Sequence, residues 1–234
     1  MIKDLHFPKC CTGQELDKYL HMGWYRLGQL IFTTDYIPLG ETWCPVFWLR
    51  FRLDKVHYGK KQLALIRANR EFTVEIKPLD ITKETEQLYE LYKNHIDFEV
   101  SPTLANYLYD GGMVGIMQNV FQSEMIEVRD NGKLIAVGVF DIGEETIAGI
   151  VNIYHPDYYK YSLGKFLMLM KMNYAMKTGK TWYYPGYIAY GYTKFDYKLF
   201  LGKDAAEIFD PYNKEWVPYT DTLLGELAGD VSHY

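Results

Sequence analysis

Residues 124–154 read EMIEVRDNGKLIAVGVFDIGEETIAGIVNIY, and they carry the strongest indication of the fold class. Apolar and polar side chains alternate along three runs, which is the pattern of strands with one buried face. The runs cover residues 124–129, 133–141 and 146–154. Asp-Asn-Gly at 130–132 suits the positive φ angles of a tight hairpin turn. This stretch therefore predicts three strands that follow one another directly.

Helices and strands are predicted on both sides of these three strands. The predicted elements are a strand at 72–77, helices at 82–95, 102–109 and 162–176, and a strand at 180–187. Thr82 and Ser162 are suited to cap their helices, because a hydroxyl accepts a hydrogen bond from the free amides of the first turn. This order of elements is similar to that of the GNAT acetyltransferases. The resemblance implies an α+β fold with a GNAT-like mixed sheet flanked by helices.

The first part of the chain is expected to form a small N-terminal subdomain. Its predicted elements are a helix at 14–22, strands at 24–33 and 45–53, and a helix at 60–69. Gly23 ends the first helix, and Pro-Leu-Gly at 38–40 supplies a turn between the two strands. We place this subdomain at residues 1–70 and the GNAT-like domain at residues 71–234.

Composition favours a cytoplasmic protein with no membrane partner. The chain has 234 residues, 48% hydrophobic and 17% aromatic, enough for one large domain or for one domain with a smaller companion. Its most apolar run, residues 163–172, contains Lys165 and Lys171 and is too short to span a bilayer. The first residues, MIKDLH, lack the apolar core of a secretion signal.

The cysteines do not form a recognisable metal motif. Cys10, Cys11 and Cys44 make neither a paired disulfide framework nor a C-x-x-C knuckle. Two adjacent cysteines usually point apart, whereas a tetrahedral site needs four ligands directed at one centre. We predict no metal and no cofactor.

Charge is distributed unevenly along the chain. The net charge is −5, yet residues 50–77 contain eight Lys or Arg against three acids, a local +5. Such a stripe can bind a phosphate backbone, although charge alone favours an ordinary solvated face. The basic residues that we select as candidates for this contact are Lys55, Lys60, Lys61, Arg67 and Arg70.

A second informative stretch, residues 183–198, contains six tyrosines and two lysines. Tyrosine combines an apolar ring with a hydroxyl and therefore suits a pocket that orients a polar ligand. Composition alone would favour a tyrosine-rich strand and edge loop. The spacing Tyr-x-Gly-Tyr followed by Lys-x-x-Tyr-Lys, however, resembles the C-terminal signature of the aminoacyl-tRNA–protein transferases, the arginyl- and leucyl-transferring enzymes.

Other segments add to this resemblance and also depart from it. Tyr154-His-Pro, a six-residue step and Ser-Leu-Gly164 are similar to a family loop, and Asp141 with Glu144 and Glu145 is similar to a family carboxylate motif. Gly-Trp-Tyr-Arg at 23–26 is similar to an N-terminal family motif. The positions at which the chain differs from the family pattern are Tyr25, Ala148, Val151 and His155.

The resemblance implies an enzyme that moves Arg or Leu from a charged tRNA to the N-terminal α-amine of a protein. Its implied partners are an aminoacyl-tRNA and an acceptor protein or peptide N-terminus. Implied catalytic residues are Asp141, Glu144 and Tyr187. Implied substrate-binding residues are Tyr154, Ser162, Gly164, Tyr184, Gly186, Lys194, Tyr197 and Lys198. Arg26 joins the basic stripe as an implied tRNA contact.

Two other functions stay open on the sequence alone. A GNAT-type acyl-CoA N-acyltransferase fits the order of elements, but Lys160-Tyr-Ser-Leu-Gly164 has bulky side chains where a pyrophosphate loop needs glycines. A non-catalytic protein that binds peptide N-termini or RNA is the third possibility. The departures from the family pattern are what support it.

Overall fold

The computed structural model describes residues 2–40, 42–96, 100–116 and 118–231. A small antiparallel sheet, in the order β1-β3-β2, forms the N-terminal part. Its strands are β1 (Ile2–His6), β2 (Tyr25–Leu27) and β3 (Leu30–Thr34). Helix α1 (Gly13–His21) connects β1 to β2, and Thr12 caps it by accepting a hydrogen bond from the amide of Glu15.

The second sheet has nine strands, in the order β12-β11-β5-β10-β9-β8-β7-β6, with β4 paired to β5 beside this path. Its strands are β4 (Tyr36–Leu39), β5 (Thr42–Arg52), β6 (Thr73–Pro78), β7 (Ser123–Asp130), β8 (Lys133–Ile142), β9 (Thr146–Tyr154), β10 (Trp182–Ala189), β11 (Ala206–Asp210) and β12 (Glu215–Pro218). Neighbouring strands are antiparallel except for β9 and β10, which run parallel. The sheet is therefore mixed.

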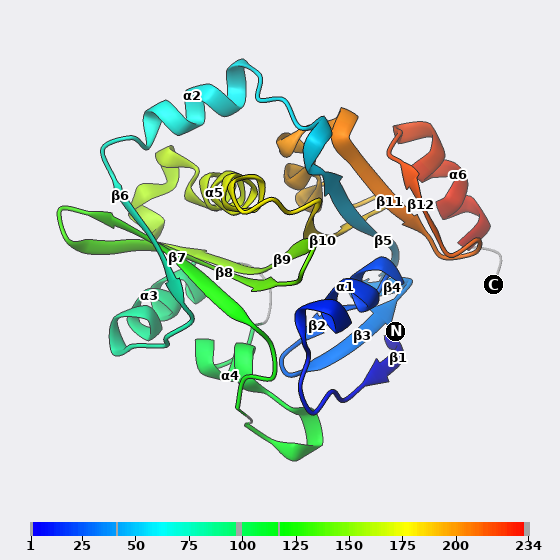
Figure 1. Ribbon diagram of the computed structural model, residues 1–234, viewed down its shortest axis with the longest axis horizontal. Helices are drawn as coiled ribbons and strands as arrows, with labels where there is room; N and C mark the ends of the chain where they lie inside the picture. The colour runs from blue at the N-terminus through cyan, green and yellow to red at the C-terminus, as the bar shows by residue number, and fades with distance from the viewer. Residues whose placement is uncertain (1, 41, 97–99, 117, 232–234) are drawn as a thin grey trace.

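Helices cover both faces of the large sheet (Figure 1). They are α2 (Lys60–Ala68), α3 (Lys83–Lys93), α4 (Leu104–Tyr109), α5 (Leu163–Lys177) and α6 (Asp221–Val231). Helices α2 and α5 lie on one face, and α3 and α4 lie on the other. Figure 1 also shows the small sheet and α1 beside β5 and β10.

The alternation of side chains along β5 explains how one strand supports two cores. Phe47, Leu49 and Phe51 belong to the buried cluster that includes α5. Trp48 points to the opposite face and belongs to the cluster formed with α1 and the small sheet. Because β5 is buried on both faces, apolar residues at 46–49 follow one another without alternation, and the buried Arg50 that comes next pairs with Glu207.

The structure confirms the α+β class, with a mixed sheet and flanking helices, and the predicted order from β6 to β10. The turn at 130–132 is also as expected, with positive φ at Asn131 and Gly132. None of the described helices is both long and apolar enough to cross a membrane.

Two details differ from the sequence prediction. The strand expected at 24–33 is two strands, because Gly28 adopts a φ of +58° and turns the chain. Ser162 precedes α5 in the left-handed region (φ 49°), and its hydroxyl makes no capping hydrogen bond. Strand β5 lies inside the large sheet between β10 and β11, and β4 pairs with β5, so both strands belong to the large sheet. The domain boundary at residue 70 stays a prediction.

Gly28 is predicted to be required for docking the β2–β3 hairpin. A Cβ at Gly28 would collide with the carbonyl oxygen of Asp110, which accepts a 2.7 Å hydrogen bond from the amide of Gln29. At Gly179, φ is also positive (+71°), but a Cβ would meet no atom within 4 Å. Gly179→Ala should cost about 1 kcal/mol through backbone strain alone, and Gly28→Ala roughly 2 kcal/mol more through the collision. Urea unfolding of both variants measures the difference, and equal losses would contradict the docking role.

Candidate functional site

Strands β9 and β10 separate partway along their length, and a cavity opens between them. They pair in parallel only from Trp182 and Thr146 to Tyr184 and Ala148. Pro185 follows, and it has no amide hydrogen with which to continue the ladder. The pairing of β10 with β5 is irregular at the same place, between Tyr183 and Gly186. The missing ladder bonds leave room for a pocket inside the sheet.

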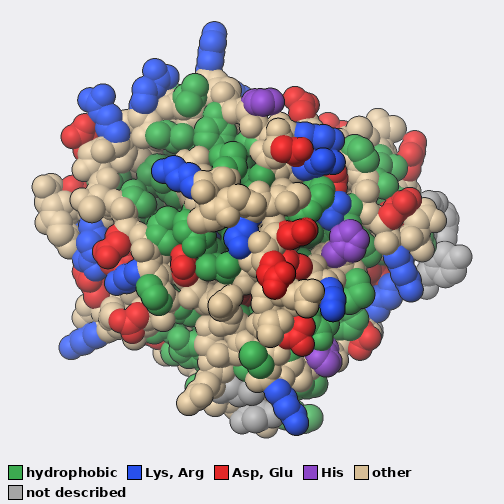
Figure 2. Space-filling model, in the orientation of Figure 1, with side chains coloured by type: hydrophobic (Ala, Val, Ile, Leu, Met, Phe, Trp, Pro, Cys, Tyr) green, Lys and Arg blue, Asp and Glu red, His purple; other side chains and the backbone are tan. Residues whose placement is uncertain are grey.

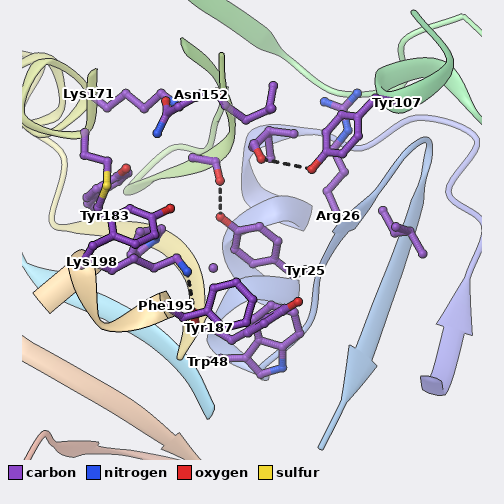
Figure 3. A pocket seen from close by; sticks show the side chains of 18 of the residues that line it. Tyr25, Arg26, Trp48, Tyr107, Asn152, Lys171, Tyr183, Tyr187, Phe195 and Lys198 are labelled. Atoms are coloured by element: carbon purple, nitrogen blue, oxygen red, sulfur yellow. Dashed lines mark hydrogen bonds between the residues drawn. The ribbon is translucent and has the colours of Figure 1, made fainter. Parts of the chain in front are cut away.

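The cavity has a volume of about 320 Å³, within the range of small-molecule sites. Its wall is rich in aromatic rings and comes from both sheets, α3, α4, α5 and the 3₁₀ helix at Thr193–Leu201. Figure 3 shows these side chains converging around Tyr25. Residues that line it include Tyr25, Arg26, Trp48, Tyr89, Tyr92, Tyr107, Gly149, Ile150, Val151, Asn152, Met168, Lys171, Tyr183, Gly186, Tyr187, Phe195, Tyr197 and Lys198.

Tyr25 holds the two separating strands at a fixed distance. Its hydroxyl lies 2.8 Å from the carbonyl oxygen of Gly149 on β9 and 2.8 Å from that of Tyr184 on β10. Its ring stacks on Trp48, with 5.1 Å between the ring centroids. Burial raises the pKa of Tyr25 well above its ordinary value, so the hydroxyl stays protonated and able to donate. Tyr25, which departs from the family pattern, thus bridges β9 and β10 where their pairing ends.

Arg26 and Asp141 form a buried ion pair beside the cavity. Nη1 of Arg26 donates to Oδ1 of Asp141 at 2.6 Å, and both side chains are almost fully buried. Ser123 also donates to this carboxylate oxygen. Burial raises the pKa of Asp141, while the Arg26 charge and the Ser123 hydroxyl act in the opposite direction.

This pairing changes the roles expected for both residues. Asp141 is not part of the cavity wall, and its carboxylate orients Arg26. Arg26 is 5% exposed, so it offers no surface to a tRNA backbone. The acid–base role of Asp141 and the tRNA contact of Arg26 therefore stay predictions from the sequence, and the buried ion pair gives them no support.

Two lysines of the cavity wall are buried. Nζ of Lys198 donates to the carbonyl oxygen of Tyr187 at 2.9 Å. Nζ of Lys171, on α5, donates to the carbonyl oxygens of Val139 and Val151 at 2.7 and 3.1 Å. Burial lowers the pKa of each lysine to about 7. Both amines can therefore exchange protons near neutral pH.

The predicted substrate residues divide into two groups. Gly186, Tyr187, Tyr197 and Lys198 line the cavity. The positions outside the lining are Tyr154, Ser162, Gly164, Tyr184 and Lys194, together with Glu144.

Local packing explains several of the positions outside the cavity. Tyr184 packs its ring against Trp216 of β12. Gly164 allows close approach of Tyr154, since a Cβ there would lie 3.1 Å from that ring. Glu144 is exposed in the β8–β9 turn.

Lys171, Trp48 and Asn152 line the cavity, and the sequence analysis assigned none of them to the site. For Lys171 a signal was present, because a lysine within the apolar run at 163–172 needs either solvent or buried acceptors. Nothing in the sequence indicates that Trp48 and Asn152 line the cavity, because their positions depend on how the strands pair in the sheet.

The basic stripe is a surface feature away from the cavity. Lys55, Lys60, Lys61, Arg67 and Arg70 are all exposed, on α2 and the segments that flank it. Figure 2 shows Lys and Arg side chains projecting from the margin of the molecule where α2 lies. Within the part of the chain that the structure describes, no three His, Cys, Asp or Glu side chains are grouped to hold a metal ion.

Sequence comparison finds known transferases that are similar to this chain. Residues 84–204 match the family model described as "Arginine-tRNA-protein transferase, C terminus". An aspartate/glutamate leucyltransferase of Leptospira interrogans is 24% identical over 226 residues, which cover 92% of this chain and 82% of that protein. Arginyl-tRNA–protein transferase 1 of Arabidopsis thaliana is 26% identical over 168 residues, 64% of this chain and 26% of that protein.

Solved structures show weaker likenesses. L-PGS from Bacillus licheniformis matches 93% of this chain and 57% of that chain, with a TM-score of 0.46 and 15% identity. A putative GNAT-family acetyltransferase from Novosphingobium aromaticivorans matches 71% of this chain and 60% of that chain, with a TM-score of 0.40 and 12% identity.

Tyr25→Phe is expected to destabilise the protein. The change removes only the hydroxyl that lies between the carbonyl oxygens of Gly149 and Tyr184. A buried acceptor left without a partner costs about 1–3 kcal/mol. Tyr159→Phe is the matched control, because Tyr159 is 80% exposed. Denaturant unfolding of both variants measures the difference, and a Tyr25→Phe protein as stable as the control would refute the bracing role.

Lys171→Met is expected to change how stability depends on pH. The pKa of Lys171 is about 7 in the folded protein and 10.5 ordinarily, because burial disfavours the charge. The unfolded chain therefore binds more protons between these values, and stability rises with pH across that window. Lys171→Met should flatten the rise between pH 7.5 and 9.5 by up to about 1.4 kcal/mol per pH unit.

The control for this measurement is Lys177→Met, an exposed lysine at the end of the same helix. Chemical unfolding at several pH values gives the slope for each protein. Lys198 contributes in the same direction in all of them, since its pKa is also lowered. Identical slopes for wild type and Lys171→Met would show that Lys171 is not neutral in the folded protein.

Proposed function

The chain belongs to the family of the arginine-tRNA-protein transferase C terminus, and on this premise we propose that it moves an amino acid from a charged tRNA to the N-terminal α-amine of a protein. The resemblance seen in the sequence is thereby confirmed, and so is the aminoacyltransferase class. The observation that carries the proposal is the cavity between β9 and β10. Gly186, Tyr187, Tyr197 and Lys198, all within the matched residues, line it.

The reaction needs positioning more than strong acid or base. The α-amine attacks the ester carbonyl, a C–N bond forms, and the C–O bond to the tRNA ribose breaks. The amine loses a proton and the ribose oxygen gains one. The ester is already activated, so an enzyme accelerates the step by aligning the two substrates and stabilising the tetrahedral oxyanion.

Two residues of the cavity wall are our candidates for this chemistry. Tyr187 lines the cavity from β10, and its pKa is raised to about 12 by burial, which keeps its hydroxyl a proton donor. We propose that this hydroxyl donates to the oxyanion. The Lys198 amine, with a pKa lowered to about 7, is suited to relay the proton that the attacking amine releases.

The proposed partners follow from the same reaction. An aminoacyl-tRNA supplies the donor, and we propose that Lys55, Lys60, Lys61, Arg67 and Arg70 contact its backbone. Such contacts give salt-dependent affinity without reading sequence. The acceptor is a protein or peptide N-terminus. We propose the cytoplasm as the compartment, and the free thiols of Cys10, Cys11 and Cys44 support this choice.

The proposal predicts aminoacyl transfer in a purified system. Labelled Leu and Arg, each on its cognate tRNA, are offered with peptides that begin with Asp, Glu, Arg or Lys. Label should appear on at least one peptide. Tyr187→Phe and Lys198→Met should each lower kcat by about tenfold or more, the scale of losing one proton-transfer or oxyanion group.

The control is again Tyr159→Phe, whose exposed side chain lies outside the cavity. It should transfer at the wild-type rate. Absence of transfer with every pair, together with tight binding of acetyl-CoA, would overturn the proposal in favour of an acyl-CoA enzyme. Absence of both would indicate a binding protein.

A further inference from the structure

Tyr183 lies in the core of the protein and still reaches the cavity. Its side chain is 1% exposed and packs in the core cluster that includes α5, where its ring stacks on Phe51. The same residue lines the cavity (Figure 3). Its hydroxyl lies close to Gly149, because a Cβ at that glycine would be 2.8 Å from Oη of Tyr183. The pairing of β9 with β10 ends just before Gly149, so the hydroxyl is placed where the sheet opens.

The hydroxyl of Tyr183 has no hydrogen-bond partner among the residues that the structure describes. Other tyrosines of the wall do use theirs, since Tyr25 and Tyr89 lie 2.8 Å from backbone carbonyl oxygens. Tyr197 is 40% exposed, so water can reach its hydroxyl. A buried polar group without a partner is unfavourable. A ligand in the cavity is therefore the partner that Tyr183 lacks.

Tyr187 approaches the same cavity from the opposite face of the sheet. It packs against the core cluster of α1 and the small sheet, with 5.3 Å between its ring centroid and that of Trp48. The two tyrosines come from one strand, and the irregular pairing between Tyr183 and Gly186 lies between them. Strand β10 thus presents one tyrosine from each of its faces to the cavity.

The chemistry of the proposed reaction needs donors of this kind. An oxyanion is stabilised by fixed hydrogen-bond donors in a site that excludes water. Burial raises the pKa of Tyr183 above its ordinary value, so its hydroxyl stays protonated at neutral pH. Its ring is held by Phe51 and the surrounding core, so little reorganisation is needed when the charge develops.

We propose that Tyr183 is a catalytic residue that donates a second hydrogen bond to the oxyanion, from the face of the sheet opposite Tyr187. The inference rests on the proposed function, because it completes the oxyanion site of that reaction. When the α-amine attacks, the C–N bond forms and an electron pair of the carbonyl group moves to its oxygen, to which both hydroxyls donate. The pair returns as the C–O bond to the ribose breaks, and neither tyrosine loses its proton.

Tyr183→Phe separates a catalytic hydroxyl from a structural one. The aminoacyl transfer assay should show kcat lower by roughly 100-fold, the scale of losing one oxyanion donor. KM for the acceptor peptide should be unchanged, because the bond forms in the transition state. The Tm should equal or exceed that of wild type, because the lost hydroxyl has no partner in the folded protein. This distinguishes Tyr183→Phe from Tyr25→Phe, which removes a bonded hydroxyl.

Tyr158→Phe is the matched control for activity. Its hydroxyl donates to Asp130 at 2.8 Å, outside the cavity. The control should transfer at the wild-type rate. A kcat for Tyr183→Phe within about threefold of this control would overturn the catalytic role. A Tm lowered as in Tyr25→Phe would show that the hydroxyl is structural and would also contradict the inference.

Gly149→Ala provides a second readout that leaves the hydroxyl in the protein. The added Cβ would push on Oη of Tyr183, whereas it meets the nearest ring atoms at 3.4 and 3.5 Å, an ordinary contact. Gly149→Ala should therefore lower kcat in wild type. In the Tyr183→Phe background it should lower kcat by less than about threefold, because the atom that it displaces is gone. Equal losses in both backgrounds would contradict an effect through this hydroxyl.

The outcomes also separate this inference from the function on which it rests. Transfer by wild type that Tyr183→Phe leaves intact would overturn the inference and leave the transferase reaction established. Absence of transfer by wild type with every donor and acceptor would overturn the proposed function, and the role of Tyr183 would fall with it.

Discussion

The guanidinium of Arg26 joins more parts of the molecule than any other group described above. It donates to the turn after β2 through Gly28, to the end of α4 through Leu108, and to β7 and β8 through Ser123 and Asp141. Phe121 lies under its plane, with 4.4 Å between Cζ and the ring centroid. Removing one partner of such a buried pair costs about 3–5 kcal/mol, because the other charge is left uncompensated. The small sheet is therefore fixed to the large one by a buried polar contact.

That contact places Tyr25, its neighbour in β2, between the separating strands. Successive residues of a strand point to opposite faces, so anchoring Arg26 in one direction directs Tyr25 in the other. The hydroxyl then reaches carbonyl oxygens on both β9 and β10. The cavity is thus a consequence of how the N-terminal hairpin is held, as well as of Pro185 in β10.

The local elements of the fold were predictable because their signals are short-range. Alternation predicted β7, β8 and β9, and Asn131-Gly132 predicted the turn between the first two. The pairing of β5 with β10 was not predictable, because partners so far apart in sequence leave no periodic signal. The separate strands β2 and β3 were missed because the apolar pattern continues through Gly28.

The sequence indicated cavity-lining residues only where several of them lie in a single segment of the chain. Tyr187, Tyr197 and Lys198 fall within the tyrosine-rich stretch, and they do line the cavity. Asp141 lies near the end of the apolar strand β8, and that position is what buries it with Arg26. A carboxylate in such a place needs a cation, and sequence alone cannot say whether the cation is a ligand or another residue of the chain.

The position of β5 has a consequence for synthesis of the chain. Its first residues pair with β4 as soon as they are made, but Val46–Arg52 pair with β10, which is translated much later. About 130 residues separate the end of β5 from the start of β10, which at ribosomal speed takes roughly 7 to 26 s. During that interval an apolar strand has open edges, and open strand edges recruit other chains. Nascent protein should therefore depend on chaperones while it emerges from the ribosome.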